Sequence, residues 1–176
     1  GLDALQDGTI CGGKLPDVDI VGLLELKLKY HHKGDIKVIY SMSDTKHYIP
    51  MPEIPGEKDF NPYYMMLKMD KNKPLYICNH ILCIVNYQQD GMTSRVLQSY
   101  EECPVSYAML REAYLEHQEI PCMFAYRQCI HYVSSWIFAK RQKKKVNSLW
   151  GRKLVWMAVI PGVILNMWVC WKNRRH

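Results

Sequence analysis

The chain has 176 residues and carries few of the short motifs that usually identify an enzyme. It has no glycine-rich phosphate loop, no Gly-x-Ser-x-Gly, no Cys-x-x-Cys and no paired acidic motif in an apolar stretch. No internal repeat with a period of about 20 to 50 residues is present, which excludes solenoids and propellers. Threonine occurs three times and serine eight times, which is sparse for a β-sandwich.

Acidic residues are absent from Lys140 to the end of the chain, although the formal net charge of the whole chain is only +6. Before Lys140 there are 17 acidic and 13 basic residues, a balance of −4, and ten bases follow. The basic excess therefore belongs to the C-terminal region. Its densest part, Lys140 to Lys145, lacks the interleaved aromatic residues of nucleic-acid surfaces, so we expect no nucleic-acid partner.

The C-terminal region also contains the longest apolar run of the chain. Leu154 to Trp171 is 18 residues without a charge and with one polar amide, Asn166. As a helix it would be about 27 Å long, close to the roughly 30 Å of a bilayer core. The sequence therefore predicts a single transmembrane helix over 154–171, with anchor residues Leu154, Trp156, Pro161, Trp168 and Trp171.

Basic residues flank this run on both sides. We expect residues 139–153 to form a juxtamembrane linker, followed after the span by a short basic tail, 172–176. The expected contacts with anionic lipid headgroups are made by Lys140, Arg141, Lys143, Lys144 and Lys145. Seven nearby bases before the span against three after it favour a cytosolic or mitochondrial matrix domain. A folded domain can cross a membrane regardless of charge, so a lumenal or extracellular side stays open.

Six cysteines precede the apolar run, and Cys170 lies within it. In a lumenal domain these six would pair as disulfides, the candidates being Cys11, Cys78, Cys83, Cys103, Cys122 and Cys129. In a reducing compartment they would be free thiols. Their spacings do not match ordinary zinc sites, and we expect no metal and no cofactor.

The remaining patterns predict an α+β fold with a strand-rich N-terminal half and a helical second half. Residues 1–19 are expected to be an irregular arm, and 20–138 a compact domain. Alternating apolar and charged residues over 24–30 indicate a strand, which pairs with 36–42 as an antiparallel hairpin. Residues 104–118 are expected to be helical, with Leu110 and Tyr114 on the face opposite Arg111.

Three motifs in the N-terminal half bear on catalysis: Gly34-Asp35-Ile36-Lys37-Val38, His47-Tyr48, and Cys78-Asn79-His80-Ile81-Leu82. A strand with Gly-Asp, a histidine on the next strand and a cysteine at a helix start resemble permuted papain-like enzymes of the lecithin:retinol acyltransferase and small phospholipase/acyltransferase group. That resemblance implies a C-terminal membrane anchor and an acyltransferase or lipid hydrolase. It also implies that Cys78 is the nucleophile, activated by His47 and a helix N-terminus.

The membrane span and the shortage of catalytic motifs together favour a binding function. Our leading hypothesis is a single-pass membrane protein that acts through protein–protein contacts, as an accessory subunit of a membrane complex or a small receptor-like module. The alternative is the membrane-anchored Cys/His acyltransferase or lipid hydrolase.

Overall fold

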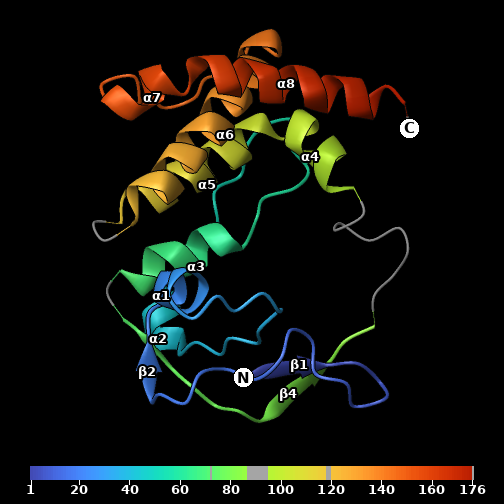
Figure 1. The fold of residues 1–176 in the computed structure, drawn as a ribbon, viewed down its shortest axis with the longest axis vertical. Coiled ribbons are helices and arrows are strands. Elements are labelled where there is room, and N and C mark those ends of the chain that lie inside the picture. The colour runs from blue at the N-terminus through green and yellow to red at the C-terminus, as the bar shows by residue number, and fades with distance from the viewer. Residues whose placement is uncertain (72, 87–94, 118–119, 176) are drawn as a thin grey trace. The chain divides into compact units, whose positions relative to one another are not determined.

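The computed structural model describes residues 1–71, 73–86, 95–117 and 120–175, and it divides into two compact units (Figure 1). Unit 1 comprises Gly1–Pro50 and Met65–Gln89, and unit 2 comprises Met51–Tyr64 and Asp90–His176. The fold is a mixture of helices and two small sheets, about 47% helical.

Unit 1 is built around two short sheets. Strand β1 (Leu2–Ala4) pairs in parallel with β4 (Ile81–Ile84), and β2 (Ile20–Val21) pairs antiparallel with β3 (Leu75–Tyr76). The helices are α1 (Leu23–Leu28), α2 (Met42–Thr45) and α3 (Tyr63–Asp70), whose first two residues belong to unit 2. The core of unit 1 is formed by the buried side chains of Leu2, Leu15, Val21 and Leu26.

The predicted strand-rich half and its antiparallel hairpin are wrong. Residues Leu23–Leu28 form α1, which buries Leu23, Leu24 and Leu26, and Ile36 makes only an isolated bridge to Leu2. Leucine, glutamate and lysine favour helix over strand, so propensity prevails over the alternating pattern. Asp70 fixes the helix start by accepting a hydrogen bond from the Leu23 amide at 2.6 Å.

Unit 2 is helical. It contains α4 (Val96–Glu102), α5 (Pro104–Leu115), α6 (Cys122–Arg141), α7 (Lys153–Met157) and α8 (Val159–Asn173). Helix α6 is central, because α4, α5, α7 and α8 all pack against it (Figure 1). Helix α5 covers most of the stretch 104–118 expected to be helical, and Gln118 lies outside the described residues.

Small and polar residues let α8 approach α6 closely. A Cβ atom added at Gly162 would lie only 2.6 Å from the Val133 Cβ, so the two backbones meet where the glycine has no side chain. Four residues further on, the buried Asn166 amide donates a hydrogen bond to the Ser134 carbonyl at 3.2 Å. The inner face of α7 and α8 is therefore buried in protein, through Val155, Ala158, Gly162, Asn166 and Val169.

The predicted transmembrane helix is also wrong. The apolar run is divided at Ala158 into α7, of five residues, and α8, of 15 residues. Within residues 1–71, 73–86, 95–117 and 120–175, no helix combines the length and the hydropathy that crossing a bilayer requires. A single-pass C-terminal anchor, and the membrane localisation inferred from it, are not supported. The prediction was wrong because the total hydropathy of the run does not distinguish its faces, and one face packs against α6.

The segment before α3 is joined to α5 by one buried carboxylate. The two oxygens of Glu57 accept hydrogen bonds from the Val105 and Ser106 amides at 2.9 and 2.8 Å. Oε2 also accepts a hydrogen bond from the Ser106 hydroxyl, and the Lys144 ammonium lies 3.2 Å from Oε1. Because Glu57 satisfies amides in the first turn of α5, it also opposes the positive end of that helix.

The α6–α8 contact predicts that Gly162→Val lowers the stability of unit 2. The added side chain overlaps Val133 and forces the helices apart, which we expect to cost about 2 kcal/mol in the free energy of unfolding. Urea denaturation followed by circular dichroism measures it. The control is Gly151→Val, where a new Cβ meets no atom within 4 Å. Equal stabilities of the two variants would contradict the contact.

The Glu57 contacts predict that Glu57→Ala destabilises unit 2 by about 2 to 4 kcal/mol, because two amides and a partly buried ammonium lose their acceptor. The exposed Glu53 in the same segment provides the matched control, and Glu53→Ala should change stability by less than about 0.5 kcal/mol. The same urea titration compares the two. A loss no larger for Glu57→Ala than for Glu53→Ala would show that the carboxylate does not hold this segment.

Candidate functional site

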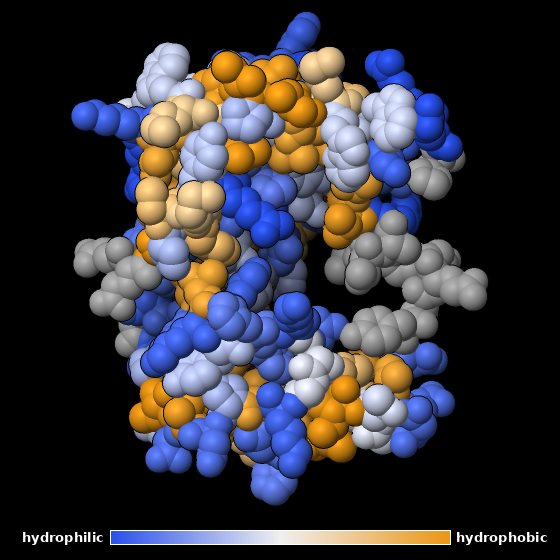
Figure 2. All heavy atoms as spheres, viewed as in Figure 1, coloured by the Kyte–Doolittle hydropathy of each residue, from blue (hydrophilic) through white to orange (hydrophobic). Residues whose placement is uncertain are grey.

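The outer face of α7 and α8 carries large apolar side chains that nothing in the described chain covers. We call five of them the outer seam: Met157, Ile160, Ile164, Met167 and Trp171. Their side chains are between 46% and 74% exposed. In Figure 2, hydrophobic residues gather over the part of unit 2 where Figure 1 draws α7 and α8. Such a concentration of exposed apolar surface is typical of an interaction site.

The spacing of the outer seam is regular. Its members follow one another at intervals of three, four, three and four residues. Within α8, that alternation places Ile160, Ile164, Met167 and Trp171 in one line along the helix, and it is the pattern with which two helices interlock. The part of the seam on α8, from Ile160 to Trp171, is about 17 Å long at 1.5 Å per residue, and Met157 lies at the end of α7. The inner face of the same helices is already packed on α6, so the outer seam is a second, unused packing surface.

Cations stand at both ends of the outer seam. Lys153 begins α7, and Lys172 and Arg175 lie over the Trp171 ring at 5.4 and 4.0 Å from its centroid. Among the described residues, none of Lys153, Lys172, Arg174 and Arg175 has a carboxylate partner. The seam is therefore an apolar stripe with unpaired positive charge at its ends.

The five residues expected to bind lipid headgroups lie in different surroundings. Lys144 pairs with Glu57, and the Arg141 guanidinium lies 3.2 Å from the Cys170 sulfur and over the Phe138 ring. The Lys140 ammonium lies 5.3 Å from the centroid of the Trp136 ring. Lys143 and Lys145 are exposed after the end of α6. Their contact with lipid stays a prediction.

The predicted anchor residues divide between the two faces of the helices. Leu154 packs against the core cluster around α6, and Pro161 is partly buried. Trp156 donates a hydrogen bond from its indole nitrogen to the Trp150 carbonyl at 2.8 Å. Trp168 and Trp171 are partly exposed on α8. Trp171 thus belongs to the outer seam, and Trp156 and Trp168 each lie next in sequence to one of its members.

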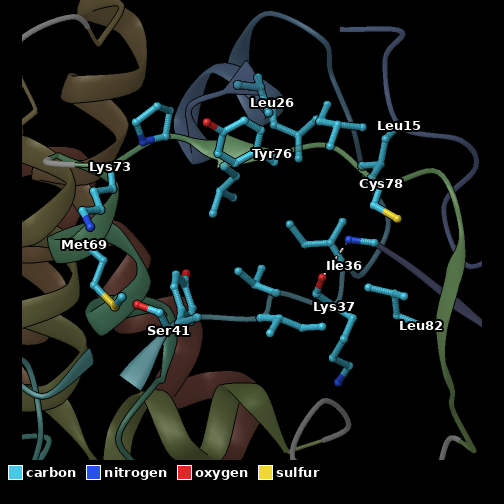
Figure 3. A pocket seen from close by; sticks show the side chains of 18 of the residues that line it. Leu15, Leu26, Ile36, Lys37, Ser41, Met69, Lys73, Tyr76, Cys78 and Leu82 are labelled. Carbon is cyan, nitrogen blue, oxygen red and sulfur yellow. Dashed lines mark hydrogen bonds between the residues drawn. The ribbon is translucent and has the colours of Figure 1, made fainter. Parts of the chain in front are cut away.

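A separate cavity of about 550 Å³ lies within unit 1, and its wall is mostly apolar. Figure 3 shows Lys73, Met69 and Ser41 at one end, with Cys78, Leu15 and Leu82 at the other. The Lys73 ammonium is paired with Asp44, and burial, with the Asp70 charge, raises the pKa of Tyr40 to about 12. The cavity therefore offers apolar volume, with the Lys73–Asp44 ion pair and the cationic Lys37 among its few charged residues.

The two candidate catalytic residues are not brought together. Cys78 lines the unit 1 cavity between β3 and β4, and it does not begin a helix as the resemblance implies. His47 follows α2, is exposed and is not part of the described cavity wall. No hydrogen bond between His47 and Cys78 is present in the described structure. The acyl-transfer hypothesis stays a prediction without a base placed beside the thiol.

All seven cysteines are free, so the predicted disulfides are wrong. Cys103 and Cys129 are buried, Cys122 is exposed, and Cys11, Cys78, Cys83 and Cys170 are intermediate. In the parts of the chain that the structure describes, no three His, Cys, Asp or Glu side chains are grouped as metal ligands. Burial raises the pKa of the Cys129 thiol, which lowers its reactivity at neutral pH.

These positions predict the order in which thiols react. Alkylation of the denatured chain without reductant should modify seven cysteines, and prior reduction should leave the mass unchanged. In the folded protein, exposed Cys122 should react with iodoacetamide at least about tenfold faster than Cys129, which is buried with a raised pKa. Peptide mass spectrometry over time measures both. Extra alkylation that appears only after reduction would contradict the free thiols.

Comparison with known proteins assigns no family. No family model, curated protein or solved structure matches the chain.

Proposed function

We propose that the protein is a binding module whose outer seam packs against a helix of a partner protein. The observation that carries the proposal is the exposed three-four alternation of Met157, Ile160, Ile164, Met167 and Trp171. Regular anchors at this spacing match the holes on a facing helix, whereas scattered exposed apolar residues would not. Burial of these five side chains supplies the favourable free energy of association.

The charge around the seam defines the partner further. Ten basic residues and no acidic residue lie between Lys140 and the end of the chain. Two copies of this chain meeting through their seams would bring these cations together, which opposes self-association. An apolar helix flanked by glutamate or aspartate places opposite charges beside Lys153, Lys172 and Arg174. The partner is therefore an amphipathic helix with acidic flanks.

Substitutions in the outer seam should leave the fold of unit 2 intact. The stability of α8 depends on its inner face, where Gly162, Asn166 and Val169 contact α6 and its neighbours. Ile164 points away from that contact and is 61% exposed. A substitution at Ile164 therefore separates partner binding from folding.

We predict that the full chain binds a synthetic 21-residue amphipathic helix with a leucine seam and glutamate flanks. The same peptide with lysine flanks should bind at least about tenfold more weakly, because it opposes the seam's cations. Ile164→Glu should weaken binding of the acidic peptide by at least about tenfold, since it buries an unpaired carboxylate against the peptide's leucine seam. Fluorescence anisotropy of labelled peptide measures the dissociation constants.

The matched control is Met123→Glu, which changes an apolar residue on α6 outside the seam that is 76% exposed, against 61% for Ile164. It should leave peptide binding unchanged, and neither variant should lower the Tm by more than a few degrees. Equal binding of both peptides, or equal effects of Ile164→Glu and Met123→Glu, would overturn the proposal. A dimer that light scattering detects and that Ile164→Glu abolishes would also overturn it. A third contradicting result is that the chain fails to bind the peptide but binds phosphatidylserine vesicles, and that Ile164→Glu abolishes this vesicle binding.

A further inference from the structure

A small aromatic pocket of about 320 Å³ lies within unit 2, separate from the outer seam. Helices α4, α5, α6 and α8 contribute to its wall, together with Asn61 and with Tyr63 at the start of α3. Its aromatic side chains are those of Tyr63, Tyr100, Tyr107, Tyr114, His131 and Trp168. Flat rings on several sides suit a ligand that is itself planar and apolar.

Arg111 is the charged residue of the described wall, and its hydrogen bonding is incomplete. One guanidinium nitrogen, Nη1, donates to the Gln128 side chain at 3.2 Å. The Nε atom is buried and has no hydrogen-bond partner in the described structure. A buried donor of a charged group without an acceptor is unfavourable, and a ligand that supplies the acceptor removes that cost.

No carboxylate of the described chain lines the pocket to neutralise Arg111. Asp59 lies near Tyr107 but accepts a hydrogen bond from the Ser99 hydroxyl at 2.8 Å. His131 adds no charge at neutral pH, because burial, with the charges of Arg111 and Arg127, lowers its pKa to about 4. The pocket wall therefore carries one positive charge among neutral aromatic groups.

We propose that this pocket binds a small aromatic carboxylic acid, whose ring lies among the tyrosines and whose carboxylate accepts hydrogen bonds from Arg111. A guanidinium presents paired donors that match the two oxygens of a carboxylate. A single cation balances a monoanion and leaves a dianionic phosphate half compensated. The volume lies at the small end of ligand sites, which favours a single ring with a short acidic side chain.

Three probes test the contributions of the aromatic ring and of the carboxylate separately. Each is titrated into the unmodified full chain by isothermal titration calorimetry. They are 4-hydroxyphenylacetate, its neutral amide 4-hydroxyphenylacetamide, and acetate. The aromatic acid should bind with a Kd below about 1 mM, and the amide and acetate at least about tenfold more weakly. Equal binding of acid and amide would overturn the role of Arg111, and equal binding of acetate would overturn the aromatic recognition.

Two variants distinguish a ligand site from a structural contact. Arg111→Met removes the guanidinium and keeps a long apolar side chain, so acid binding should fall at least about tenfold while Tm stays the same or rises. The control is Arg127→Met, which removes an exposed cation of α6 and should preserve binding. A lower Tm with unchanged affinity for Arg111→Met would make Arg111 structural and refute the proposal.

The carboxylate that binds Arg111 could instead belong to a side chain of a partner protein. Competition between the free acid and the acidic helical peptide distinguishes these two sources. If the pocket takes a free acid, saturating 4-hydroxyphenylacetate should leave the affinity of the acidic helical peptide within about twofold, since the outer seam binds the peptide elsewhere. Displacement of the peptide by the acid, together with loss of peptide binding in Arg111→Met, would assign the pocket to the protein partner and overturn the free ligand.

Discussion

The close approach of α8 to α6 determines the arrangement of unit 2. It exists because Gly162 has no side chain where Val133 would otherwise collide, and because Ser134 offers a carbonyl to the Asn166 amide. A buried amide without that acceptor would leave a polar group unpaired, at a cost of about 1 to 3 kcal/mol. The small inner residues therefore hold α8 against α6 and give the most apolar helix of the chain a fixed orientation. Everything proposed for α8 depends on which of its faces that contact covers.

With the inner face occupied, the larger apolar residues of α8 point outward. Ile160, Ile164 and Met167 stay exposed because the small positions, not the large ones, meet α6. The same contact places Trp168 and Val169 on the wall of the pocket that contains Arg111. One helix thus contributes to two separate surfaces, an apolar seam suited to a helix and an aromatic pocket suited to an organic anion. Both surfaces follow from the close contact between α8 and α6 at Gly162.

Part of this arrangement could be read from the sequence. The helix beginning at Pro104 was predictable because proline suits a first helical turn. The strand expected over 24–30 was wrong because the helix propensity of leucine, glutamate and lysine outweighed the two-residue alternation. The outer seam was visible as a three-four spacing, but total hydropathy of 154–171 suggested a membrane span. Arg111 looked like a solvent-facing residue of its helix. The tyrosines at 100, 107 and 114, spaced by seven, were the available signal for the pocket beside it.

The contact between Gly162 and Val133 can be measured directly in solution by nuclear magnetic resonance of the methyl-labelled full chain. The account predicts strong nuclear Overhauser effects from the Val133 methyl protons to the Gly162 Hα protons, and none from Val133 to the Ile164 methyl groups, which face outward. Contacts from Val133 to Ile164 without contacts to Gly162 would place the large face of α8 on α6. That result would remove both the outer seam and the geometry of the aromatic pocket.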